Sequence, residues 1–386
     1  MAKRNPMSDA LPPAQHLLTF AQTLDGGGVE RAMLRLARGW IARGWRVTLL
    51  LGSGGGPLAA ELPAGLEIVE LGDARYPALV RAAPGVVRAV RPDVIFCPGN
   101  HYTSVAAWTR ARLGRATPPI VGKVSNALRR RDMGFALAAA YAVWLRLHPC
   151  FLDRLVAMTP AMRDEAVAAM RMPIERTSVI ANPPAAKLAD AAGVPLPPGR
   201  FILGVGRLAA QKRWDRLIDA LPRLADPTVR LAILGEGAER DALEAQAAAL
   251  GVSERVALPG YAADPLPALA RAAVVALTSD FEGVPGVLRE AASVGVPVVT
   301  TNSSVAVGEM VRGDAGTIVP VGDDDALVAA LDAWLSPGRA RPAPRVTVDD
   351  SVGDYLALFN ATLAARAIRP ASWRLPRSPR DAPARP

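Results

Sequence analysis

The stretch Thr278-Ser-Asp-Phe-Glu-Gly-Val-Pro-Gly-Val-Leu-Arg-Glu290 holds two glutamates, Glu282 and Glu290, with seven residues between them. The apolar run at 272–277 predicts a buried strand before it, and apolar residues at helical spacing predict a helix that contains Glu290. Two glycines and a proline mark the turn between, with the proline near the helix start. Helix N-termini offer unpaired N–H groups. These carboxylates are therefore expected to bind hydroxyls or a cation; a capping glutamate beside a solvated one is the alternative.

The residues after Glu290 continue the pattern, because 291–300 reads as the rest of the helix, a glycine stop and another buried strand. Together, 279–299 resembles the glutamate–seven–glutamate signature of the retaining GT-B glycosyltransferases of family 4. The resemblance extends over about 16–335 and rests on two further motifs, at 26–31 and 206–212. It implies two Rossmann-like, doubly wound domains facing across a cleft, and retaining transfer of a hexose from a nucleotide-diphosphate sugar.

The length and charge of the chain agree with two domains, one of which faces an anionic surface. At 386 residues the chain is too long for one ordinary core. The net charge is +9, and residues 1–180 carry 23 Lys and Arg against 13 Asp and Glu. A basic half beside a near-neutral half suggests an anionic membrane face. Nucleic acid is not expected, because no nucleic-acid motif or interleaved aromatic pattern is present.

The sequence also predicts where the protein resides. Two cysteines, Cys97 and Cys150, indicate a reducing compartment without a disulfide framework. The first ten residues lack the apolar core of a signal peptide, and the apolar run at 133–145 is too short to cross a bilayer. We therefore expect a cytoplasmic protein, peripheral on the inner face of the plasma membrane. The segment 129–148 reads either as an interfacial anchor or as an ordinary core helix.

Apolar runs alternate with helical patterns along the first half, which predicts a doubly wound parallel sheet. In such sheets ligands bind beyond the carboxyl ends of the strands. Asn100 and His101 follow the strand expected at 94–97, and Asn126 follows the one at 120–124, so these three are the acceptor-side candidates. A capping or core histidine is the alternative for His101. Further strands are expected at 16–24, 47–51, 67–71, 154–157 and 178–180.

Two glycine-rich turns are the candidates for holding a diphosphate. The first, at 25–31, lacks the spacing of a dinucleotide fingerprint and could be only a tight turn. The second follows a strand at 201–205 and adds Arg207 and Lys212, and two cations beside such a loop suit a diphosphate. Gly204-x-Gly206-x-x-Ala209 also meets the loose dinucleotide pattern. An NAD-dependent oxidoreductase therefore stays open, as does a catalytically silent nucleotide-sugar-binding protein.

The resemblance assigns roles to named residues. It implies that Arg207 and Lys212 stabilise the leaving diphosphate, that Glu282 holds donor-sugar hydroxyls, and that Glu290 binds the ribose. No protein nucleophile or general base is implied, and no metal or other cofactor is expected. The implied donor-binding residues are Gly27, Gly28, Gly206, Arg207, Lys212, Gly235, Tyr261, Glu282, Gly283, Val284 and Glu290.

The acidic triplet at 323–325 matches the Asp-x-Asp metal signature of the other glycosyltransferase class, but first-turn acids and an N-cap explain it better. The acceptor is expected to be a lipid-linked or lipopolysaccharide-type glycan. The expected organisation is an acceptor-side domain at 1–181, a linker at 182–198, a donor domain at 199–350, a helix at 351–367 packing back on the first domain, and a disordered tail at 368–386.

Overall fold

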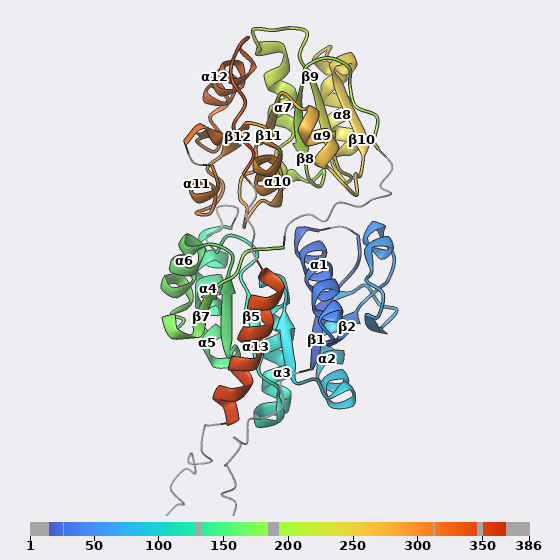
Figure 1. Cartoon of the computed structure of the whole chain (residues 1–386), viewed down its shortest axis with the longest axis vertical. Coiled ribbons are helices and arrows are strands. Elements are labelled where there is room, and N and C mark those ends of the chain that lie inside the picture. Colours follow the sequence, from blue (N-terminus) through green and yellow to red (C-terminus); the bar gives the residue numbers. More distant parts are fainter. Residues whose placement is uncertain are drawn as a thin grey trace, which may run out of the picture.

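The computed structural model describes residues 15–25, 27–128, 133–183, 193–311, 313–345 and 350–367. The chain forms two α/β domains stacked along the long axis of the molecule (Figure 1). Each domain is built on one parallel sheet with helices on its faces. This confirms the expected two-domain, doubly wound GT-B architecture.

The first domain contains a seven-stranded sheet in the order β3-β2-β1-β4-β5-β6-β7. Its central strands are buried throughout, as expected for parallel strands covered on both faces. The strands are β1 (His16–Ala21), β2 (Arg46–Leu51), β3 (Glu67–Glu70), β4 (Val94–Cys97), β5 (Ile120–Lys123), β6 (Arg154–Ala157) and β7 (Thr177–Val179). The α-helices are α1 (Gly28–Ala42), α2 (Tyr76–Val90), α3 (Thr103–Leu113), α4 (Phe135–Arg146), α5 (His148–Phe151) and α6 (Pro160–Met170).

The second domain contains a six-stranded sheet in the order β10-β9-β8-β11-β12-β13. Its strands are β8 (Phe201–Val205), β9 (Arg230–Leu234), β10 (Val256–Gly260), β11 (Val274–Leu277), β12 (Val298–Thr301) and β13 (Gly316–Val319). Its α-helices are α7 (Asp215–Ala220), α8 (Arg240–Ala249), α9 (Leu266–Arg271), α10 (Gly286–Val294), α11 (Val307–Met310) and α12 (Asp324–Leu335). The order turns back between β8 and β11, so the carboxyl ends of these two strands form the switch point where ligands of this fold class bind.

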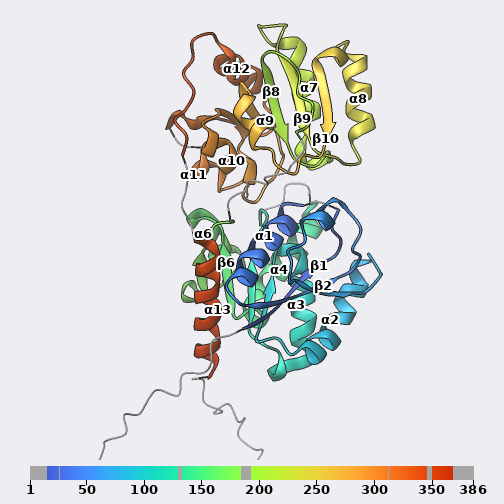
Figure 2. The same cartoon turned by 45° about the vertical axis from the view of Figure 1, so that its right-hand side comes forward.

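The last described helix, α13 (Ser351–Ala367), returns from the second domain and lies along the first (Figures 1 and 2). It packs against α1. Trp40 of α1 sits edge-on to Phe96, Tyr355 and Phe359, with ring centroids 5.4–5.7 Å apart. Burial of several aromatic rings makes this a strong apolar anchor. The residues that we expected to be a disordered tail lie outside the described part of the chain.

Several element boundaries differ from the expected ones for local reasons. The first strand ends at Ala21 rather than at residue 24, because the Gln22 amide donates to the Tyr102 hydroxyl at 3.0 Å. The strand before the glutamate motif begins at Val274, since α9 ends at Arg271 and Ala272 is its C-cap. Asp323 accepts a hydrogen bond from the Ala326 amide at 2.9 Å, which confirms the expected N-cap of α12. Cys150 is exposed, whereas Cys97 is buried.

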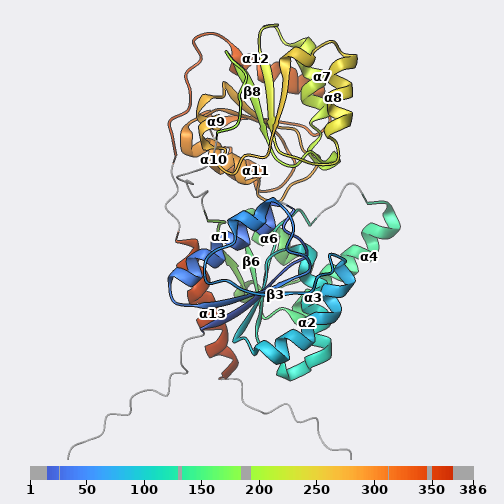
Figure 3. The ribbon, with the colours of Figure 1, turned by 90° about the vertical axis from the view of Figure 1, so that its right-hand side faces the viewer.

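None of the helices in the described ranges is both long and apolar enough to cross a membrane. Helix α4 is nevertheless unusual, because it projects from the side of the first domain and exposes apolar side chains (Figure 3). The arginine cluster that precedes it lies outside the described residues.

Candidate active site

A lysine–glutamate pair lies at the switch point of the second sheet. Strands β8 and β11 are neighbours, so the loops after them meet. There Lys212 Nζ donates to Glu282 Oε1 at 2.5 Å, and Ser279 Oγ donates to the same oxygen at 2.6 Å. The Lys212 and Glu282 side chains are 17% and 9% exposed. The structure therefore places together two residues that lie 70 positions apart in the sequence.

Backbone contacts fix the two loops that hold this pair. Thr278 Oγ1 donates to the Lys212 carbonyl at 3.0 Å, and Gln211 Nε2 donates to the Phe281 carbonyl at 2.7 Å. The Asp280 amide donates to the Gln211 carbonyl at 3.0 Å. Because these bonds tie one loop to the other, they fix the relative position of the lysine and the glutamate.

The glycine turn after β8 packs backbone against backbone. A Cβ added at Gly235, whose φ is +153°, would lie 1.9 Å from the Gly206 carbonyl oxygen. The β8 and β9 turns can therefore meet only without side chains at this point. Arg207 follows Gly206 with an exposed side chain, and its carbonyl accepts from Trp214 Nε1 at 2.9 Å. The turn thus combines close backbone packing with positive charge on the same edge.

Glu290 lies in the second turn of α10 and faces the first domain. Its Oε1 is 3.8 Å from Arg35 Nη1 of α1, and both side chains are largely buried, at 14% and 16% exposure. Burial raises the pKa of Glu290 and lowers the pKa of Arg35, each against the opposing effect of its partner. The expected ribose ligand is therefore held by a cation of the opposite domain.

Tyr261 is part of a second contact between the domains. Its hydroxyl bonds to Glu61, and Arg31 donates to that hydroxyl. The Arg31 guanidinium also lies 4.8 Å from the centre of the tyrosine ring. Arg31 and Arg35 are one turn apart on α1, so this helix supplies two cations to the boundary between the domains.

The start of α1 lies at the domain boundary, and so does the loop that holds Glu282 (residues 278–285, called the glutamate loop). Gly27 caps α1 and Gly28 begins it, so the amides of this helix start are directed away from the helix body. A Cβ at Gly283 would lie 2.1 Å from the Ser125 carbonyl oxygen. Val284 packs against the core of the first domain. The glutamate loop is thus in direct contact with the loop after β5.

The acceptor-side candidates occupy this same edge of the first sheet. Asn100 joins the loops after β4 and β5, because its Oδ1 accepts from the Ser125 amide at 2.8 Å and its Nδ2 donates to the Asn126 carbonyl at 3.2 Å. His101 Nε2 is 3.0 Å from Gln22 Oε1, and burial lowers the pKa of its imidazole. Asn126 caps its own loop by accepting from the Ala127 amide. Asn100 therefore shapes the loop, whereas His101 presents a neutral ring.

Family models match both halves of this architecture. Residues 27–183 match the "Glycosyl transferase 4-like domain", and residues 193–344 match "Glycosyl transferases group 1". The chain belongs to the GT-B glycosyltransferases of the family-4 type. The resemblance noted for the glutamate motif is thereby confirmed over these two stretches of the chain.

Relatives of this glycosyltransferase include the lipopolysaccharide core biosynthesis glycosyltransferase LpsE of Rhizobium meliloti, 36% identical over 36% of this chain and 41% of its own. A GDP-mannose-dependent α-(1-6)-phosphatidylinositol monomannoside mannosyltransferase of Mycolicibacterium smegmatis is 35% identical over 44% of this chain and 46% of its own. The chain thus spans less than half the length of these two relatives. The crystal structure of Anabaena HepE in complex with UDP-glucose covers 91% of this chain and 99% of its own, with 20% identity and a TM-score of 0.65.

Lys123 is a residue of this glycosyltransferase that sequence reasoning missed. It ends β5 with only 2% of its surface exposed, and its Nζ donates to Asn182 Oδ1 at 2.8 Å. The Asn182 carbonyl in turn accepts from Arg289, the neighbour of Glu290. Lys123 therefore connects the first sheet with the crossing segment and α10. The sequence did contain a signal for Lys123, because it is the one charged residue in an otherwise apolar strand.

The titration of Lys123 should be visible in the stability of the protein. Burial lowers its pKa from 10.5 to about 8, against the attraction of Glu30. The unfolded chain keeps this proton up to about pH 10.5, whereas the folded chain loses it near pH 8, so this contribution to stability rises with pH between those values. Lys123→Met removes the titration. Across this pH window, the free energy of unfolding of the wild type should rise by roughly 3 kcal/mol more than that of the variant.

Urea unfolding of both proteins at the two ends of that pH window measures this difference. Other groups titrate in both proteins, so their contributions to the pH dependence cancel in the difference. A difference that does not change with pH would show that the folded and unfolded states hold this proton equally.

Proposed function

We propose that this protein transfers a hexose from a UDP- or GDP-linked sugar to a hydroxyl group of a glycan or lipid-linked acceptor. The proposal places this step in the synthesis of lipopolysaccharide or another cell-surface polysaccharide. The names of LpsE and of the phosphatidylinositol monomannoside mannosyltransferase support that class of acceptor. The second of these names also supports a GDP-linked donor, and the UDP-glucose bound to the structural neighbour supports a UDP-linked one.

The observation that carries this proposal is the Lys212–Glu282 pair at the carboxyl ends of β8 and β11. When the glycosidic bond breaks, negative charge grows on the leaving diphosphate and positive charge grows on the sugar ring. Lys212, with Arg207 on the same turn, stabilises the first charge, and Glu282 stabilises the second while it holds sugar hydroxyls. The salt bridge between Lys212 and Glu282 places both charges at the carboxyl ends of β8 and β11.

The reaction proceeds with retention and without a protein base in this proposal. The donor phosphate takes the proton of the acceptor hydroxyl as the new bond forms on the same face of the sugar. His101 lies on the acceptor side, where its neutral ring hydrogen-bonds rather than carrying charge. Arg207 and Lys212 supply the positive charge that a metal ion supplies elsewhere, so the proposed reaction is metal-independent.

The geometry disfavours the oxidoreductase alternative. In a dinucleotide-binding turn, the glycines allow the helix and the strand to pack closely around the pyrophosphate. Here Lys212 crosses that turn, and a Cβ at Gly206 would lie 3.2 Å from its Cε. An NAD-dependent enzyme would also leave the Glu282–Lys212 pair without a role. A silent binding protein has the same geometry and differs only in turnover.

Donor hydrolysis tests turnover without knowledge of the acceptor. The purified protein is incubated with a panel of UDP- and GDP-hexoses, and the released diphosphate and the anomer of the freed sugar are followed by NMR. The proposal predicts slow release from one donor, with the anomeric configuration retained, and its loss in Glu282→Gln. Binding without release from any donor in the panel would favour the silent protein, and inversion would overturn the stereochemical part of the proposal.

A further inference from the structure

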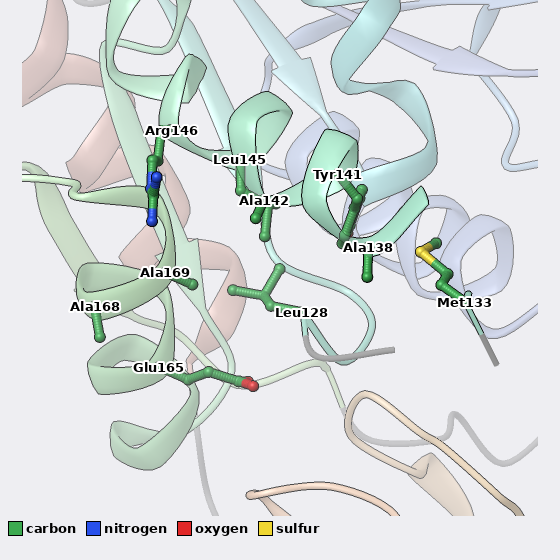
Figure 4. Close-up of a pocket in the computed structure, with 10 residues that line it drawn as sticks. All are labelled: Leu128, Met133, Ala138, Tyr141, Ala142, Leu145, Arg146, Glu165, Ala168 and Ala169. Carbon is green, nitrogen blue, oxygen red and sulfur yellow. The ribbon is translucent and has the colours of Figure 1, made fainter. Parts of the chain in front are cut away.

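A cavity of about 400 Å³ lies between α4 and α6, beside the proposed acceptor side of the first domain (Figure 4). Alanines face each other across it, Ala138 and Ala142 from α4 and Ala168 and Ala169 from α6, and their side chains are too small to fill the space. The volume falls in the range of small-molecule sites, about 300–1,000 Å³. The two helices pack on each other elsewhere, so the hollow is a local feature of their contact.

The lining of the cavity suits a hydrocarbon chain. Apart from Tyr141, Arg146 and Glu165, the lining residues are alanine, leucine or methionine. Figure 4 shows Arg146 at one end of the cavity and Met133 at the other, with the apolar side chains between them. A polar ligand of this size would leave most of its hydrogen bonds unmade against such walls, at a cost in free energy.

One loop borders both the cavity and the second domain. Leu128, which lines the cavity, belongs to the loop after β5, and in the same loop Ser125 meets Gly283 of the second domain. Helix α6 also starts at the domain boundary, where the Ala161 amide donates to Glu309 Oε1 at 2.9 Å. A chain in the cavity would therefore have its polar end near the acceptor side of the cleft.

The outer face of α4 indicates where such a chain comes from. Phe135 is 92% exposed, Leu137 60% and Val143 56%, and residues 135–145 carry no charge. Exposed apolar side chains on one surface helix are typical of a segment that lies in the membrane interface. The cavity is lined by this same helix, so a ligand can enter it from the membrane interface.

We propose that the α4–α6 cavity binds one hydrocarbon chain of the lipid-linked acceptor, while the outer face of α4 rests in the membrane interface. The assignment rests on the proposed function and specifies its acceptor as a lipid whose chain is part of what the protein recognises. The chain in the cavity would hold the acceptor sugar at the cleft and would restrict its motion there.

Direct binding of a chain tests the proposal without the natural acceptor. Dansyl-undecanoate is titrated into the full-length protein and its fluorescence is recorded. Wild type should bind it saturably. Ala142→Phe, which fills the cavity, should weaken binding by at least about tenfold, the effect of losing most of the buried apolar contact. Ala140→Phe is the matched control, because Ala140 is exposed on the same helix; this variant should stay within about twofold of wild type.

A second cavity variant distinguishes filling of the cavity from misfolding of the protein. Ala138→Met adds a flexible side chain that adapts to the available space, so it should fold normally and weaken probe binding in the same direction. Thermal melting and nucleotide binding are measured on every variant. Absence of saturable binding by wild type, or equal loss in Ala142→Phe and Ala140→Phe, would overturn the cavity assignment.

Competition identifies the source of the chain. Decyl glucoside, below its micelle concentration, should displace the probe, whereas methyl glucoside should not. Displacement by dihexanoyl phosphatidylglycerol as strong as that by decyl glucoside would indicate a site for membrane lipid and would overturn the acceptor assignment. Failure of the proposed function is distinguishable, since it would appear as probe binding in a protein that binds neither UDP nor GDP.

Discussion

Lys212→Met is expected to lower kcat by about 10²–10³, the loss typical of removing one preorganised group that stabilises charge in the transition state. Methionine keeps the length of the side chain and removes the charge that faces the leaving diphosphate. It also leaves Glu282, which is 9% exposed, with the Ser279 hydroxyl at 2.6 Å but without its cation. Steady-state kinetics with the donor identified by the hydrolysis panel measure the effect.

Two further variants separate catalysis from stability in this experiment. Lys212→Met combined with Glu282→Gln removes the unpaired buried charge, so it should recover thermal stability without recovering turnover. Arg213→Met is the matched control, because this neighbouring cation pairs with Asp215 at 2.8 Å and with Asp280 at 3.4 Å instead of with Glu282. Recovery of turnover in the double variant would contradict a catalytic role for Lys212.

Gly283→Ala should lower kcat/KM by at least about tenfold, because small displacements of reacting groups reduce rates strongly. Its Cβ would lie 2.1 Å from the Ser125 carbonyl oxygen and 2.9 Å from the Asn126 Cα. Both are backbone atoms of the opposite domain, so the conflict is relieved only when the glutamate loop and the first domain separate. The cleft would then be too wide for donor and acceptor to meet.

Gly286→Ala is the control for this substitution, since nothing lies within 4 Å of a Cβ at Gly286, three residues further on. Binding of the nucleotide diphosphate alone should survive in both variants, because Arg207, Lys212 and Glu290 all belong to the second domain. Small-angle scattering should show a longer particle for Gly283→Ala. Wild-type kcat/KM in this variant would show that contact between the two loops is not needed for transfer.

Sequence patterns predicted the fold well because the strands and helices around a parallel sheet can be recognised from short local patterns. Apolar runs such as 94–97 and 274–277 can be read as buried strands directly, and their alternation with helices predicts two doubly wound sheets. The glutamate motif likewise specifies its own strand, turn and helix, and places Glu290 in α10. Boundaries failed where a loop contact ended a strand early, as the Tyr102 hydroxyl does at Gln22.

The site was only partly predictable, because much of it depends on how the two domains meet. Arg35 was not among the predicted site residues, yet it faces Glu290 across the cleft. Helix α4 permitted two interpretations, an interfacial anchor and a core helix. The exposure of Leu137 and Val143 further along the helix disagrees with a core helix that has only a solvated end. This exposure follows from the position of α4 at the side of the domain, which no local pattern encodes.

Calorimetric titration with UDP, GDP, ADP and NAD, on wild type and on Glu290→Ala, measures whether the second domain binds a nucleotide-sugar donor through Glu290. We expect that one nucleoside diphosphate binds wild type and that Glu290→Ala weakens this binding by about tenfold or more, the cost of losing charged hydrogen bonds to the ribose. Binding of NAD alone, unaffected by Glu290→Ala, would contradict the donor site described here.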